Sequence, residues 1–79
     1  VGPIAVGNGP RGLAVTRDGA CVYVANLLSN TLSVIQTSDN TVVGSIPTGS
    51  GPGLVAVTPS GDYLYVTNYS GNTVSVIPI

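Results

Sequence analysis

The chain has 79 residues and a net charge of -1, and its charged residues are only Arg11, Arg17, Asp18, Asp39 and Asp62. A chain this short forms at most one small domain, and without lysine, histidine or a basic cluster it cannot neutralise a phosphate backbone, which excludes nucleic-acid binding. Its apolar runs are far shorter than the roughly 18 residues that cross a bilayer, so we predict no transmembrane segment.

In chain order, the sequence opens with an apolar segment at residues 1–6 and continues with a glycine-rich segment at residues 7–12. Short runs rich in β-branched residues follow, at residues 12–16, 21–26, 31–37 and 41–48. Residues that favour tight turns separate these runs, as in the pairs Asp18-Gly19 and Asp39-Asn40. Such runs are typical of strands rather than helices. The first half of the chain therefore predicts a four-stranded antiparallel meander.

The second half of the chain repeats the first. When residues 1–37 are paired with residues 43–79, an offset of 42, 18 of the 37 pairs are identical. Both faces of the predicted strands are apolar, because Tyr65 points to one face whereas Leu64 and Val66 point to the other. A four-stranded repeat of this length, covered on both faces, is typical of a blade packed between blades. We predict an all-β protein with about two β-propeller blades, in preference to a solenoid or a sandwich.

Two motifs recur at constant spacing in the two copies. Tyr-Val-Ala-Asn at residues 23–26 corresponds to Tyr-Val-Thr-Asn at residues 65–68, and each is followed by Asn-Thr-(Leu/Val)-Ser-Val-Ile. With the Gly-Pro and Ala-Val-Thr segments that precede them, these motifs resemble the YVTN family of β-propeller repeats over essentially the whole chain. Members of that family are typically seven-bladed propellers of bacterial and archaeal cell-surface and surface-layer proteins. The resemblance implies an extracellular or cell-surface location, and this chain departs from it in having about two blades.

The register of the repeat divides the chain into blades. Residues 7–48 are predicted to form the first blade, and residues 49–79 a second blade that lacks its fourth strand. Residues 1–6 match a fourth strand, which we expect to complete the second blade of a neighbouring copy. The residues of this assembly strand and of its acceptor are Ile4, Val6, Val74 and Val76. Because neither copy has the polar outer face of a terminal repeat, we expect further copies in a ring or filament, or further blades of a longer chain, to cover both ends.

The sequence offers no catalytic, cofactor-binding or metal site within one chain. Cys21 has no histidine to activate it and is interpreted as a small buried residue. The three aspartates lie apart, in or beside turns, and cannot form a paired carboxylate or a metal cluster. The pattern G-x-G-x-x-G at residues 7–12 leads into a strand instead of a helix, so we assign it to the connection between blades.

Several asparagine and tyrosine residues are candidates for surface or interface roles. Asn68 begins the only glycosylation sequon and is a candidate site for a glycan. Asn26 occupies the same place without a sequon, which favours a role for both asparagines in the turn. Tyr23 and Tyr65 are interpreted as packing residues between blades, and Tyr69, which lies in a turn, as an exposed contact.

These features predict a non-enzymatic structural module that self-assembles and serves as a scaffold or adhesion surface. The alternatives are a module whose loops bind a glycan or a protein, and a fragment of a larger seven-bladed propeller. A third alternative, a redox enzyme subunit, rests on the fold alone. The chain has no histidine, methionine or lysine to ligate or tether a cofactor, so we expect none.

Overall fold

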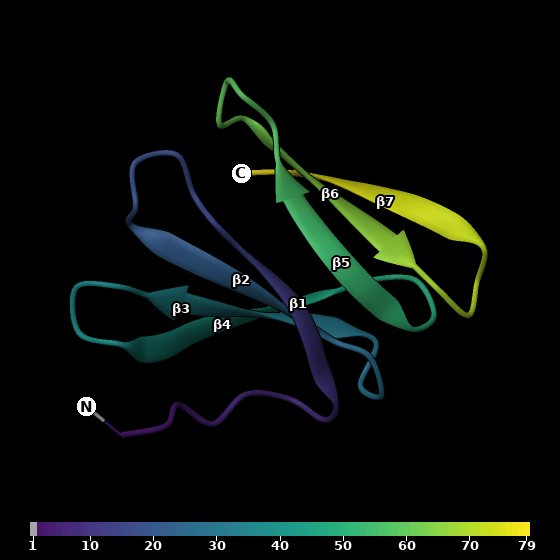
Figure 1. Cartoon of the computed structure of the whole chain (residues 1–79), viewed down its shortest axis with the longest axis horizontal. Coiled ribbons are helices and arrows are strands. Elements are labelled where there is room, and N and C mark those ends of the chain that lie inside the picture. Colours follow the sequence, from purple (N-terminus) through teal and green to yellow (C-terminus); the bar gives the residue numbers. More distant parts are fainter. Residues whose placement is uncertain (1) are drawn as a thin grey trace.

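A computed structural model describes residues 2–79 of the chain, which form two antiparallel sheets and no helix (Figure 1). The first sheet contains β1 (Pro10–Val15), β2 (Cys21–Asn26), β3 (Thr31–Gln36) and β4 (Thr41–Pro47). The second sheet contains β5 (Pro52–Val57), β6 (Tyr63–Asn68) and β7 (Thr73–Pro78). Each strand pairs only with its neighbours in the chain, in the orders β1-β2-β3-β4 and β5-β6-β7. The prediction of an all-β protein built from antiparallel meanders is confirmed.

The first strand of each sheet begins earlier than the sequence suggests. We expected this strand to start at residue 12, but β1 starts at Pro10 and β5 at the equivalent Pro52. A proline at the first position of a strand removes no hydrogen bond from the interior of the ladder. Both prolines are therefore compatible with the sheet.

Residues with positive φ angles close the hairpins. Asn30 (φ 56°) and Asn72 (φ 55°) occupy the same place in the loops after β2 and β6, and Gly19 (φ 76°) and Gly61 (φ 80°) in the loops after β1 and β5. Asparagine is one of the few residues besides glycine that adopt the left-handed region at low cost. The local sequence therefore specifies each turn, and both copies turn at matching places.

The two sheets pack against each other around a shared core. Tyr23, Ala25 and Leu32 of the first sheet form a buried cluster with Leu64 and Val66 of the second sheet. The leading strand of the second sheet, β5, contacts both β1 and β2 (Figure 1). The faces of the sheets that point toward each other are thus the ones that are removed from water.

The two leading strands approach each other closely, which restricts the residues that they can hold. A Cβ atom on Gly12 of β1 would lie 2.6 Å from the carbonyl oxygen of Gly53 in β5. Real side chains do not tolerate such a contact, so a glycine is required where the strands meet. Small residues at this point are what the innermost strands of neighbouring blades need.

Residues 2–9, which precede β1, form no strand within their own chain. We predicted that residues 1–6 pair with another copy, and that pairing stays a prediction; residue 1 itself lies outside the described range. Residues 7–9 are held by the loop between β2 and β3: the Leu27 N–H donates to the Gly9 carbonyl at 2.9 Å, and the Asn8 N–H donates to the Ser29 hydroxyl at 2.8 Å. The glycine-rich segment is therefore tied to the first sheet.

A buried asparagine holds the chain segment that enters each sheet. Asn68 donates from Nδ2 to the hydroxyls of Thr73 at 3.1 Å and Ser75 at 2.8 Å, and Asn26 makes the equivalent pair of bonds in the first sheet. Both asparagines are almost fully buried. Gly49, on the connection from β4 to β5, lies directly against the Asn68 side chain, as Gly7 does against Asn26. We call each such pair an asparagine–glycine contact.

Replacing Gly49 by alanine is expected to lower the free energy of unfolding by about 1–3 kcal/mol, the usual cost of overpacking a core. The new Cβ atom would lie 2.7 Å from Asn68 Nδ2, and the buried asparagine has little room to move. Urea unfolding followed by circular dichroism measures the effect. The matched control is Gly44→Ala in β4, where the new Cβ atom meets Val34 at an ordinary 3.7 Å. Equal stability of the two variants would contradict the prediction.

Candidate functional site

The face of the second sheet that points away from the first sheet is apolar and exposed. Tyr65 of β6 pairs with Val76 of β7 on this face. Because alternate side chains of a strand point to the same face, Tyr63 and Val74 lie there too. These four side chains are between 46% and 57% exposed, whereas Leu64 on the opposite face of the same strand is fully buried. We call this set of four residues the outer face of the second sheet. It has the composition of a core but no cover among the described residues.

The first sheet also has a face that points away from the shared core. Leu13 lies opposite Val24 and Val15 opposite Val22, which places these residues together on that face. Leu13 and Val15 are more than half exposed, while Val24 and Ile35 are buried. We call this the outer face of the first sheet. The segment at residues 7–9 lies at the Asn26 end of this face, as the contact of Gly7 with Asn26 shows.

The two outer faces correspond, through the repeat, to the two faces that meet inside the chain. Tyr23 lies on the inner face of the first sheet, and an offset of 42 residues places Tyr65 at the same position of the second sheet. Tyr23 is 8% exposed and Tyr65 is 47% exposed. Their sequence contexts match, so the difference in exposure arises because a sheet covers Tyr23 and none covers Tyr65. That Tyr65 packs between blades stays a prediction, which needs a further blade beyond the second sheet.

The residues that are predicted to accept the assembly strand lie at a sheet edge. Val74 and Val76 belong to β7, which pairs with β6 and with no other strand of the described residues. Ile4 and Val6 are half-buried and lie outside any strand. One edge of β7 is therefore open to a further strand. Their pairing across copies stays a prediction.

The structure places the sequon asparagine inside the sheet. Asn68 is 2% exposed, and its Nδ2 atom, to which a glycan would be attached, is engaged with Thr73 and Ser75. Glycan attachment would require the side chain to leave this site. The sequence correctly related Asn68 to Asn26, but the asparagine–glycine contact is a long-range feature that no local pattern indicated.

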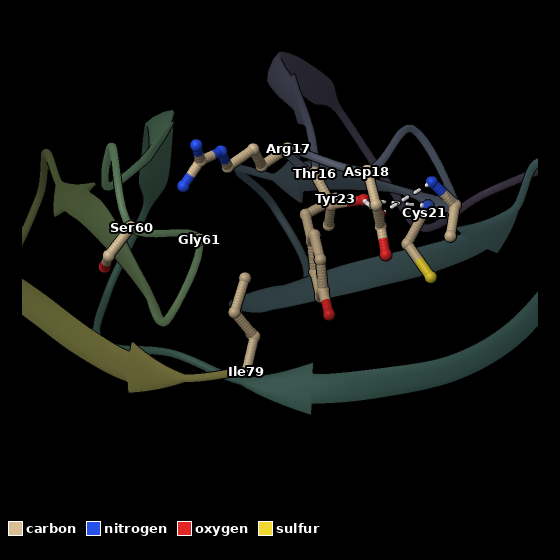
Figure 2. A pocket seen from close by; sticks show the side chains of 9 residues that line it. Thr16, Arg17, Asp18, Cys21, Tyr23, Ser60, Gly61 and Ile79 are labelled. Carbon is tan, nitrogen blue, oxygen red and sulfur yellow. Dashed lines mark hydrogen bonds between the residues drawn. The ribbon is translucent and has the colours of Figure 1, made fainter.

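One cavity, of about 540 Å³, lies between the loop that follows β1 and the loop that follows β5 (Figure 2). Arg17 extends across it toward Ser60 and Gly61, while Cys21 and Tyr23 line the opposite wall. Cys21 is half-buried rather than buried as predicted, because it is the first residue of β2 and lines the cavity there.

The carboxylate of Asp18, which lines this cavity, accepts hydrogen bonds from neighbouring residues of its own loop. The Ala20 N–H donates to Asp18 at 3.0 Å and the Thr16 hydroxyl donates to it at 2.7 Å, and these bonds lower the pKa of Asp18. Burial raises the pKa of Tyr23, and the neighbouring Cys21 contributes to the same shift. Asp18 therefore serves the turn, and the cavity holds no nucleophile paired with a base.

A second cavity, of about 610 Å³, lies at the opposite end of the sheets. Arg11 and Leu27 contribute to it from the first copy, and Leu54, Thr67 and Tyr69 contribute from the second. Tyr69, predicted to be an exposed contact, is 80% exposed. Its role as a contact stays a prediction. This cavity joins residues from both copies that are far apart in the sequence.

Residues 2–79 contain no group of three or more histidine, cysteine or acidic side chains positioned to hold a metal ion. The same range contains no helix that is long and apolar enough to cross a membrane.

Comparison with solved structures shows that the fold recurs inside larger chains. Hydrazine synthase from Kuenenia stuttgartiensis matches with a TM-score of 0.87 and 26% identity, over 100% of this chain and 22% of that chain. A functionally unknown protein from Desulfotomaculum acetoxidans matches with a TM-score of 0.73 and 27% identity, over 90% of this chain and 26% of that chain. The chain thus spans roughly a quarter of the length of either. No family model matches the chain, and no curated protein matches it.

These matches support a β-propeller-like fold without supporting the YVTN family in particular. Together with the two antiparallel meanders, they show that the chain consists of β-propeller blades, one with four strands and one with three.

Proposed function

We propose that the chain is a non-enzymatic structural unit of a β-propeller that associates head to tail with copies of itself at the cell surface. The outer face of the second sheet packs in this arrangement on the outer face of the first sheet of the next copy. The contrast between Tyr23 and Tyr65 carries the proposal, because equivalent residues are buried only where a sheet covers them. The resemblance of residues 23–26 and 65–68 to YVTN repeats supports the cell-surface location.

The energy of the uncovered faces supports association. Burying one large apolar side chain contributes about 1.5–3 kcal/mol, and the outer face of the second sheet exposes four of them. The net stability of a whole domain is only about 5–15 kcal/mol. These side chains are already about half buried, so covering the face contributes about half of that sum, roughly 3–6 kcal/mol, and the low charge of the chain does little to oppose it.

The edge of β7 gives the association a direction. In a head-to-tail arrangement each copy offers one outer face and one strand edge to the next, which leads to a closed ring or to a filament. The assembly strand at residues 1–6 pairs in this proposal with β7 of the neighbour, where Val74 and Val76 are exposed. Such pairing would also remove the open edge, which otherwise templates aggregation.

The mass of the assembly in solution tests the proposal. Sedimentation velocity and native mass spectrometry at micromolar concentration are expected to show a discrete multiple of 7.8 kDa or a filament. A cooperatively folded monomer of 7.8 kDa would overturn the proposal.

A second candidate is a unit of a longer propeller, in which blades of the same polypeptide cover the outer faces. The match to 22% of the hydrazine synthase chain favours it, since the same fold there lies within a larger chain. Fusing further copies of the 42-residue repeat to the chain distinguishes the candidates. A monomeric fusion with a cooperative unfolding transition supports the second candidate, whereas continued association supports the first.

A further inference from the structure

The acidic residues all lie at one end of the sheets. Asp18 follows β1, Asp39 lies between β3 and β4, and Asp62 precedes β6. Because the strands are antiparallel, these three loops lie at one end, which we call the aspartate end. Arg11 stands at the start of β1, at the opposite end, which holds no acidic residue. A cation without a nearby acid remains available to an anionic ligand.

The second cavity lies at this arginine end. Its volume of about 610 Å³ falls within the range of small-molecule sites, about 300–1,000 Å³. Arg11 lines it together with the exposed side chains of Leu54 and Tyr69. Gly12 and Gly53 also line it, where β1 and β5 come together. All these residues belong to one chain, and Thr67 pairs with Val74 on the outer face of the second sheet, so the next copy in the proposed assembly comes close to the site.

The side chains of this cavity match the parts of a carboxylated sugar. The planar guanidinium of Arg11 can bind a carboxylate through two parallel hydrogen bonds. The exposed ring of Tyr69 offers a flat apolar surface to the C–H face of a pyranose, and its hydroxyl provides a polar partner. Thr67 accepts a hydrogen bond from the Leu54 N–H at 2.9 Å through Oγ1, which leaves its hydroxyl hydrogen to donate to a sugar oxygen.

We propose that the cavity formed by Arg11, Thr67 and Tyr69 is a binding site for a carboxylated sugar of the uronic acid type. The ligand requires both the negative charge and the ring. Arg11 has no counterpart in the second copy, where Gly53 stands at the equivalent position, so the site occurs once per chain and not once per repeat.

Isothermal titration calorimetry on the parent chain, with its mass checked by sedimentation under the same conditions, tests the site. Sodium glucuronate is expected to bind, with glucose and acetate at least about tenfold weaker, because each lacks one of the two required groups. Arg11→Gln and Tyr69→Leu are each expected to weaken glucuronate binding by about tenfold or more. Both side chains are exposed, so the fold should persist, and circular dichroism checks it.

The matched control is Arg17→Gln, which removes the same charge at the aspartate end and is expected to leave glucuronate binding unchanged. No binding of glucuronate to the parent chain would overturn the proposal. Equal losses in Arg11→Gln and Arg17→Gln would overturn it as well, since they would reveal a general charge effect. Binding of a polyglutamate peptide in place of glucuronate would assign the cavity to an acidic protein segment and likewise reject the sugar. The mass of each variant is measured beside its affinity, so that a loss of binding is not confused with a change in association.

Discussion

Replacing Tyr65 by aspartate is expected to abolish the head-to-tail association and to leave a destabilised monomer of 7.8 kDa. Tyr65 lies at the centre of the outer face of the second sheet, opposite Val76 and Ala56. An aspartate there would place an unpaired carboxylate in the contact between copies, where desolvation is costly. Loss of a central tyrosine commonly reduces the free energy of association by at least about 2 kcal/mol, which raises the dissociation constant of each contact roughly 30-fold.

The matched control for this variant is Tyr69→Asp. It introduces the same chemical change on a tyrosine that is also exposed, at 80% against 47% for Tyr65, but Tyr69 lies in the loop after β6 rather than on the outer face. Sedimentation velocity over a concentration series should show the parent mass for Tyr69→Asp and the monomer for Tyr65→Asp. If both variants keep the parent mass, the outer face of the second sheet is not an interface.

Replacing Asn68 by alanine is expected to lower the free energy of unfolding by about 2–3 kcal/mol, from two lost hydrogen bonds and a small cavity. The bonds to Thr73 and Ser75 tie β6 to β7, and the amide also fills the space beside Gly49. Urea unfolding at matched protein concentration measures the loss, because association also contributes to the observed stability. The control is Asn8→Ala, an exposed position where a change within about 0.5 kcal/mol is expected. A similarly small loss at Asn68 would show that its hydrogen bonds do not hold the sheet.

Asn68→Asp adds a dependence on pH that alanine does not have. Burial disfavours the ionised carboxylate, so the pKa of the new aspartate in the folded chain is raised above the value of about 3.9 in the unfolded chain. The folded state then binds more protons, and stability falls as the pH rises through and above the unfolded value. Unfolding measured between pH 3 and pH 7 should show a growing loss relative to the parent chain, whereas Asn68→Ala should show a loss that is nearly constant.

Most of the fold could be predicted because it is encoded locally. The strand of residues 21–26 was placed with its exact bounds, since β-branched residues and a turn residue at each end define it. The turns at Asn30 and Asn72 likewise depend on the preference of one residue for positive φ. The start of β1 at Pro10 was missed, because a proline normally argues against a strand and only the pairing with Asn26 places it in the sheet.

The candidate sites were predicted less well because they depend on contacts between distant residues. Nothing in the local pattern indicates that Asn68 packs against Gly49 or that Arg11 and Tyr69 line the same cavity. The repeat predicted that a single chain leaves an apolar face uncovered at each end, but not which side of each sheet this is, because the sequence context of Tyr65 is that of Tyr23 and only the packing of whole sheets distinguishes them. The composition of a strand predicts that both of its faces are apolar, but not which partner covers them.

The meander topology also affects how the chain folds. Every hairpin joins neighbouring strands through a short loop, so closing it costs little chain entropy. Contacts of long sequence separation are concentrated where β5 docks on β1 and β2. The first sheet can therefore form while the second is still being synthesised. The second sheet then packs on the inner face of the first as it folds.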